Sequence, residues 1–256
     1  MMAWLADVPP AALAVVPLVI FAAYTVFGAT GFGSSVINVP TIAHWFPLSF
    51  TVPLVTAVDF VATANATFRQ WRGADLAEIG RLLPTMALGV LAGATLLIEL
   101  PPWIALLALA VFVIAYGIYL LAGPRALPSI APAWAWPIGF FGGIFSVLFG
   151  TGGPIYVVYL SARVHDKSAL RATMSTLVAI AVVVRTAVFV ATKLLLDARV
   201  LGFAVALLPF MLAGYWLGNR LHAALSRESL LKLIALLLLA NGALLVDRAL
   251  ALGHAS

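Results

Sequence analysis

The chain has 256 residues, of which 64% are hydrophobic and 9% are charged, and its mean hydropathy is +1.13. A soluble domain carries roughly 25% charged residues, so this composition excludes an ordinary soluble protein and indicates an integral membrane protein. The net charge of +5 fits Lys and Arg in cytoplasmic loops better than nucleic-acid binding. The sequence has no cysteine, which excludes disulfides, thiolate metal sites and cysteine nucleophiles.

The apolar runs are long and continuous, which predicts an all-α polytopic membrane protein rather than a β-barrel. The first run is expected in the mature fold, because residues 1–7 contain no Lys or Arg and lack the basic region of a signal peptide. In chain order we predict a broken helix over 11–46, helices over 50–68, 77–98 and 103–122, a proline-bearing linker over 124–133, a second broken helix over 134–162, and helices over 168–194, 200–220 and 229–249.

An internal repeat divides this single membrane domain into 1–123 and 134–256. Four residues recur 125 positions later: Pro84 as Pro209, Gly89 as Gly214, Gly93 as Gly218 and Gly117 as Gly242. The Gly89/Gly93 and Gly214/Gly218 pairs lie inside continuous apolar helices. Their spacing is typical of close helix packing.

The distribution of basic residues predicts that the two repeats are inverted. If each half crossed the membrane an even number of times, the thirteen Lys and Arg other than Arg185 would divide seven to six. If each half crosses an odd number of times, ten gather on one side, and Lys193, Arg199 and Arg248 lie opposite. The second division obeys the positive-inside rule. We therefore expect the basic loops in the cytoplasm and both termini outside, with each half a glycine-broken element, re-entrant or crossing twice, followed by three transmembrane helices.

The two breaks are where the sequence places function. The first is the stretch Gly28-Ala29-Thr30-Gly31-Phe32-Gly33-Ser34-Ser35, and the second is Phe149-Gly150-Thr151-Gly152-Gly153-Pro154. Non-helical backbone at membrane depth is tolerated only where protein buries it or a water-filled cavity solvates it. The helices after each break would point their free N–H groups and positive dipole ends into it, which is the outline of an anion site near the midplane. The alternative is that these glycines only permit close packing.

The candidate residues surround these breaks. Arg185 could bind or filter the anion, and Asp59 could be its partner or a coupling group, because ionisable residues inside spans are costly. A buried structural ion pair is the alternative. The candidate substrate-binding residues are Thr30, Gly31, Gly33, Ser34, Ser35, Asn38, Gly150, Thr151, Gly152, Gly153, Pro154, Tyr156 and Arg185.

Several of these side chains also have a structural interpretation. Asn38 could contact substrate or satisfy nearby backbone, and Tyr156 and Tyr159 could line a pocket or pack helices. His44, beside Trp45, could relay protons or lie at the interface. No P-loop, H-E-x-x-H, G-x-S-x-G or metal-ligand spacing is present, so neither an enzyme nor a cofactor or metal is predicted.

At the two breaks the chain resembles the TauE/SafE family of sulfite and organosulfonate exporters. The family has a G-x-G-G motif with a nearby proline in each half. The second copy here is Gly150-Thr151-Gly152-Gly153-Pro154, and the first is Gly31-Phe32-Gly33-Ser34 with Pro40, where Ser34 replaces the usual glycine. The resemblance implies transport of a small sulfur-containing or carboxylate anion, driven by an ion gradient, with sulfite as the first candidate.

The sequence therefore predicts a secondary transporter of a small anion, sulfite or a small organosulfonate, in the bacterial inner membrane. Its partners would be the anion, the lipid bilayer and a coupling proton or ion, with no nucleic acid. A passive anion channel and a membrane-embedded accessory subunit are the alternatives. Export and import, a proton or another coupling ion, and a homo-oligomer are all compatible with this sequence.

Overall fold

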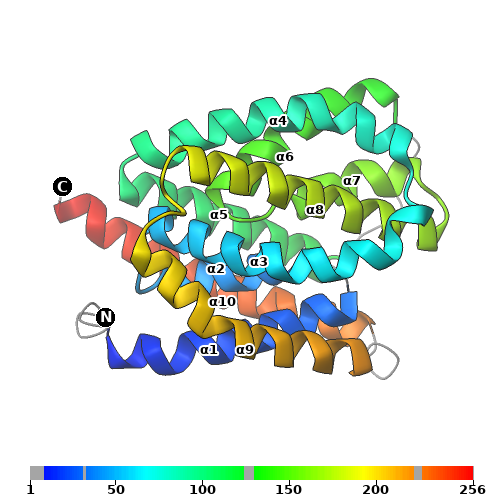
Figure 1. The fold of residues 1–256 in the computed structure, drawn as a ribbon. Helices are drawn as coiled ribbons and strands as arrows, with labels where there is room; N and C mark the ends of the chain where they lie inside the picture. Colours follow the sequence, from blue (N-terminus) through cyan, green and yellow to red (C-terminus); the bar gives the residue numbers. More distant parts are fainter. Residues whose placement is uncertain (1–8, 31–32, 124–129, 222–226, 256) are drawn as a thin grey trace.

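The computed structural model describes residues 9–30, 33–123, 130–221 and 227–255, and these residues are helical with no strand among them (Figure 1). Within these described ranges, two short 3₁₀ helices, η2 (Trp71–Gly73) and η3 (Pro132–Trp134), accompany ten α-helices. The α-helices are α1 (Pro10–Thr30), α2 (Ser34–Ile42), α3 (Leu48–Gln70), α4 (Leu76–Glu99), α5 (Pro102–Leu121), α6 (Ala135–Leu148), α7 (Gly153–Arg163), α8 (Lys167–Ala191), α9 (Ala198–Leu221) and α10 (Arg227–Ala255).

Six of these helices contain a segment long and apolar enough to cross a membrane: α1, α4, α5, α8, α9 and α10. The all-helical prediction is confirmed for the described residues, and each predicted broken helix is two helices: α1 with 21 residues and α2 with 9, then α6 with 14 and α7 with 11. Most of the predicted linker, residues 124–129, lies outside the described residues. Gly28 departs from the prediction, because it lies inside α1 and not in the break.

Local side chains account for the starts of the helices that follow the polar connections. Asp75 Oδ1 accepts hydrogen bonds from Ala77 N and Glu78 N, both at 3.1 Å, at the start of α4. Asp166 Oδ1 accepts from Ala169 N at 2.8 Å at the start of α8. A hydrogen bond from the Ser168 hydroxyl and that from Ala169 N hold the pKa of Asp166 below its ordinary value, so it caps the helix as a carboxylate.

The repeated glycines lie where helices pack most closely, as their spacing predicted. A Cβ on Gly93 of α4 would lie 2.9 Å from Ile144 O of α6, and one on Gly89 would overlap Phe140 O. In the other half, Gly214 and Gly218 of α9 lie equally close to Phe21 O and Thr25 O of α1. In each pair, the glycine that comes later in the chain contacts the residue that comes later in the partner helix. Helices α4 and α6, and α1 and α9, are therefore parallel neighbours.

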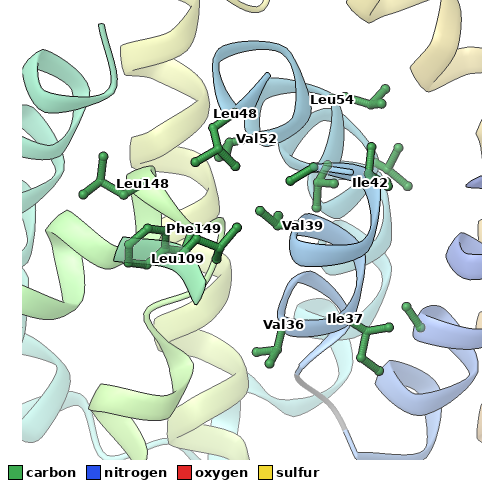
Figure 2. Packing of buried hydrophobic residues seen from close by; sticks show 14 of the residues in the cluster. Val36, Ile37, Val39, Ile42, Leu48, Val52, Leu54, Leu109, Leu148 and Phe149 are labelled. Carbon is green, nitrogen blue, oxygen red and sulfur yellow. The ribbon is translucent and has the colours of Figure 1, made fainter. Parts of the chain in front are cut away.

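The short helix α2 lies in the protein interior and not against lipid. Its residues are buried except for Thr41, and Val36, Val39 and Ile42 belong to the main hydrophobic cluster. Figure 2 shows Val39 on the side of α2 that faces Leu148 and Phe149, at the end of α6. With nine residues, α2 is about 13 Å long, roughly half the thickness of a hydrocarbon core.

The chain enters and leaves the bundle at the same end. Figure 1 shows the first turn of α1 and the last turn of α10 at one end, with α2 running back toward that end. Ser35 at the start of α2 contacts Asp59 in the middle of α3, whereas the end of α2 is joined to the start of α3 by a short turn. In the first half, α1 thus enters the bundle from this end and α2 returns toward the same end. The three longer helices α3, α4 and α5 follow.

Candidate functional site

A cavity of about 30 Å³ lies between the two breaks. A volume of this size holds a water molecule but no larger ligand, so the walls of the cavity lie close together. Its wall consists of both breaks and the middles of α3 and α8. The residues in the wall are Phe27, Gly33, Ser34, Ser35, Asp59, Thr63, Ser146, Gly150, Thr151, Gly152, Gly153, Tyr156, Val178, Ala181, Val182 and Arg185.

The first break ends at Gly33, which precedes α2 with φ of 96°. This left-handed conformation favours glycine, so Gly33 supplies the turn that the sequence predicted there. Ser34 and Ser35 follow in the first turn of α2, and both are buried. The Ser34 hydroxyl donates to Asp59 Oδ1 at 3.0 Å and the Ser35 hydroxyl to Asp59 Oδ2 at 2.6 Å. Both hydroxyls therefore donate to Asp59 in this structure.

The second break contacts the first directly. Gly150 has φ of 71°, and a Cβ there would lie 2.8 Å from Val39 Cγ2 and 3.4 Å from Ser35 Cβ, both on α2. Gly152 is just as confined, since a Cβ would lie 2.6 Å from Gly142 O. At the start of α7, Ile155 N and Tyr156 N donate to Gly152 O, and Pro154 carries no N–H. What the starts of α2 and α7 both bring to the cavity is therefore the positive end of a helix dipole.

Asp59 and Arg185 form an ion pair in the cavity wall. Arg185 Nη2 donates to Asp59 Oδ2 at 3.3 Å, and the two residues are only 1% and 3% exposed, respectively. Arg185 Nη1 also donates to Ser146 O at 2.6 Å. Tyr24 Oη donates to Asp59 Oδ1 at 2.6 Å. The carboxylate thus accepts hydrogen bonds from α1, α2 and α8, and the pair as a whole is neutral.

Two predicted residues of the first break have no described side chain. Gly31 lies outside the described residues, and Thr30 ends α1 with its side chain undescribed. Gly33, Ser34, Ser35, Gly150, Thr151, Gly152, Gly153, Tyr156, Arg185 and Asp59 all line the cavity.

Asn38 and Pro154 lie beside the cavity and not in its wall. Asn38 is fully buried one turn along α2, and neither atom of its amide group has a hydrogen-bond partner among the described residues. Pro154 lines an apolar groove with Tyr116 and Tyr119 of α5. Tyr156 does face the cavity, with its ring against Gly142 and Gly152, and its hydroxyl has no partner within the described part of the chain.

The sequence interpretation missed Tyr24, Phe27, Thr63 and Ser146. Tyr24 is the one aromatic hydroxyl in the first apolar run, and Ser146 stands one helical turn before Gly150. Both are polar groups at the depth of a predicted break, and that position was the available signal. Phe27 and Thr63 carry no comparable signal, because such residues are common in membrane helices.

A second polar cluster ties the end of α7 to the start of α4. Glu78 is 4% exposed, and its Oε1 accepts from Arg163 Nη2 at 2.9 Å and from Arg81. Tyr159 Oη donates to Glu78 Oε2 at 2.5 Å. Tyr159, predicted as a pocket or packing residue, thus belongs to this cluster and not to the cavity.

At the opposite end of the bundle, the turn after α2 is held by α10. His44 Nε2 lies 3.2 Å from Asn241 Oδ1, and Arg248 Nη1 donates to Ala43 O at 2.6 Å. Burial lowers the pKa of His44, so its imidazole is neutral at pH 7. His44 therefore serves here as a neutral partner of α10, far from the cavity.

Comparison with known proteins decides the family. Residues 16–245 match the family described as sulfite exporter TauE/SafE. The chain belongs to the TauE/SafE family. It is also 29% identical, over 195 residues, to the probable inner membrane transporter protein TsaS of Comamonas testosteroni. The aligned residues cover 74% of this chain and 80% of that protein. No solved structure matches. The protein is therefore a multi-pass membrane transporter of the TauE/SafE family, as the paired motifs indicated.

Proposed function

We propose that this TauE/SafE member is a secondary transporter that carries a small anion, sulfite or a small organosulfonate, across the plasma membrane. The observation that carries the proposal is Arg185, a fully buried guanidinium in the wall of a cavity where two helix N-termini converge. A cation inside a membrane protein is costly and usually marks a substrate or ion pathway. Guanidinium groups bind oxyanions such as carboxylates and phosphates with two parallel hydrogen bonds, and helix N-termini favour anions.

Alternating access requires two halves that can exchange roles, and the packing supports inverted repeats. The first helix of each half packs against the fourth of the other: α1 on α9 and α6 on α4. The third helices, α3 and α8, pack on each other, as do the fifth, α5 and α10. Exchanging the halves leaves this pattern unchanged. In the proposed cycle the cavity opens to one side of the membrane and then to the other.

The proposed orientation places both termini outside and the basic end in the cytoplasm. At the end away from the termini lie η2, the start of α4 and the turn between α7 and α8, with Arg72, Arg81, Arg163, Lys167 and Arg171. Lys193, Arg199 and Arg248 lie at the end that holds the termini. This division follows the positive-inside rule.

The test is transport by the purified protein in liposomes. Uptake of labelled sulfite should be accelerated by unlabelled sulfite inside (counterflow), with thiosulfate, sulfoacetate, sulfolactate, sulfate and acetate as competitors. Arg185→Gln should weaken anion binding about tenfold or more, because it removes a charged hydrogen-bond donor. The matched control is Arg220→Gln, since Arg220 is exposed and stacks on Trp216, with 4.0 Å between its Cζ and the ring centroid.

The outcomes separate the alternatives. Flux without counterflow would indicate a passive channel, and a lack of transport by the purified chain would indicate an accessory subunit or a different substrate class. If Arg185→Gln does not fold, Arg185→Lys keeps the charge and loses the planar fork, and should still weaken binding. Unchanged binding in the folded Arg185 variant would overturn the site.

A further inference from the structure

We propose that Asp59 is the proton site of the transport cycle, and that the cavity accepts a monovalent anion together with one proton. The inference rests on the proposed function and deepens it, because it names the charge of the substrate and the coupling ion. It follows from the geometry of the ion pair and the size of the cavity.

The contacts of Asp59 in the structure suit a carboxylate. Both its oxygens accept hydrogen bonds, from the hydroxyls of Tyr24, Ser34 and Ser35 and from Arg185. All four groups can act as donors, so no proton is needed on Asp59 to complete these contacts. The negative charge of Asp59 balances the positive charge of Arg185, and the pair is neutral.

An anion at this site must share Arg185 with Asp59. Arg185 Nη2 donates to Asp59 Oδ2 and Nη1 to Ser146 O, whereas Nε has no hydrogen-bond partner among the described residues. The cavity of about 30 Å³ is smaller than a sulfonate group, so binding must widen it while Arg185 turns toward the anion. One guanidinium would then face two negative charges away from bulk water, and an unpaired buried charge is strongly destabilising.

A proton on Asp59 removes that excess charge. The protonated carboxyl can still accept hydrogen bonds from the serine hydroxyls, and its new O–H can donate to an oxygen of the bound anion. No other group in the wall can take the proton. The titratable side chains there are Asp59, Tyr156 and Arg185, and Tyr24 contacts Asp59 from α1. The tyrosines and the arginine already hold their protons. The described parts of α4, α5, α6 and α9 add no ionisable side chain to the wall.

The charge balance defines the substrate class. One anion, one proton, Asp59 and Arg185 give a neutral loaded site only if the anion is monovalent, such as hydrogensulfite or a simple alkanesulfonate. A divalent anion such as sulfate would leave a net negative charge. The proton comes from the water on the side to which the cavity is open, and returns to water on the other side when Asp59 pairs with Arg185 again. An inward proton gradient would drive uptake, and a sufficient outward anion gradient would drive export.

The first experiment uses the wild-type protein alone. Methanesulfonate, a monovalent anion at any ordinary pH, is added to purified protein in weakly buffered detergent solution with a pH-sensitive dye. We expect uptake of about one proton per bound anion. In liposomes, methanesulfonate transport should be unaffected by a potential set with potassium and valinomycin. Sulfate should neither bind comparably nor move protons.

The second experiment uses Asp59→Asn, which keeps the shape and imitates the neutral carboxyl. This variant should still exchange methanesulfonate across the membrane, but without proton movement and without dependence on pH. The matched control is Asp247→Asn on α10, where the carboxylate is exposed and distant from the cavity. It should behave as wild type.

The results distinguish failure of this inference from failure of the proposed function. If the wild type binds and transports none of the anions in the panel, the proposed function fails. If it transports methanesulfonate without taking up protons, or carries sulfate equally well, or if Asp59→Asn still moves protons, the inference alone is overturned. Should Asp59→Asn not fold, the proton stoichiometry of the wild type decides.

Discussion

At the scale of single residues, Glu78 shows how a charge can be buried for structure alone. Its carboxylate contacts Arg163, Arg81 and Tyr159 and joins the start of α4 to the end of α7. Arg81 and Arg163 are partly exposed, so water compensates for part of any lost contact. Glu78 differs in this respect from Asp59, whose partner Arg185 is only 1% exposed.

Glu78→Gln should therefore destabilise the protein by about 1–3 kcal/mol, because two guanidinium groups lose their shared counter-charge. The lower transition temperature should be visible in thermal unfolding of the purified protein in detergent. Glu99→Gln is the matched control, since Glu99 is exposed at the end of the same helix. A transition temperature for Glu78→Gln equal to that of Glu99→Gln would show that the cluster adds nothing to stability.

The sequence was informative about single residues where a charge stood in an apolar run. Asp59 and Arg185 were identified in this way, because a charge within a span needs a partner or a function. The hydroxyls that surround Asp59 could be identified only as candidates for the substrate. Whether Ser35 faces Asp59 or open space depends on the rotation of α2 about its axis, and that rotation is fixed by the packing of Val36 and Val39. Local sequence does not contain this information.

At the scale of elements, glycine serves two purposes that sequence alone separates only in part. Gly89 and Gly218 were predicted to pack helices, and they do. Gly28 was predicted to belong to the first break, but it lies in α1, where a Cβ would lie 2.5 Å from Tyr215 O of α9. A glycine at a turn and a glycine at a close helix contact look alike until the neighbouring helix is known.

Gly89→Ala should destabilise the protein by about 1–3 kcal/mol, which corresponds to several degrees in Tm, because the added methyl group overlaps Phe140 O. Gly80→Ala in the same helix is the control, since a Cβ there meets nothing within 4 Å. It should leave the Tm unchanged or raise it slightly. Thermal unfolding of the two purified variants makes the comparison, and equal Tm values would mean that α4 and α6 can separate at no cost.

At the scale of the whole molecule, the sequence carries information about the side of each connection but not about the partners of the helices. Basic residues remain in loops, so their distribution predicts the side on which each connection lies, and the start of α1 and the end of α10 lie at one end of the bundle. The glycine pairs indicated close packing without saying on what. That α1 packs on α9 from the other half, and α4 on α6, follows from contacts between segments far apart in the chain.

The orientation of the molecule can be tested cleanly because the chain contains no cysteine. Leu196 lies in the turn between α8 and α9 and His165 in the turn between α7 and α8, at opposite ends of the bundle, and both are exposed. If the ten basic residues are cytoplasmic, a membrane-impermeant maleimide added to intact cells should label Leu196→Cys but not His165→Cys. Neither substitution alters a Lys or Arg, so the charge distribution that sets the orientation is preserved. After permeabilisation both variants should react, whereas the wild-type chain should not. Labelling of His165→Cys from outside the cell would place the termini in the cytoplasm and invert the proposed topology.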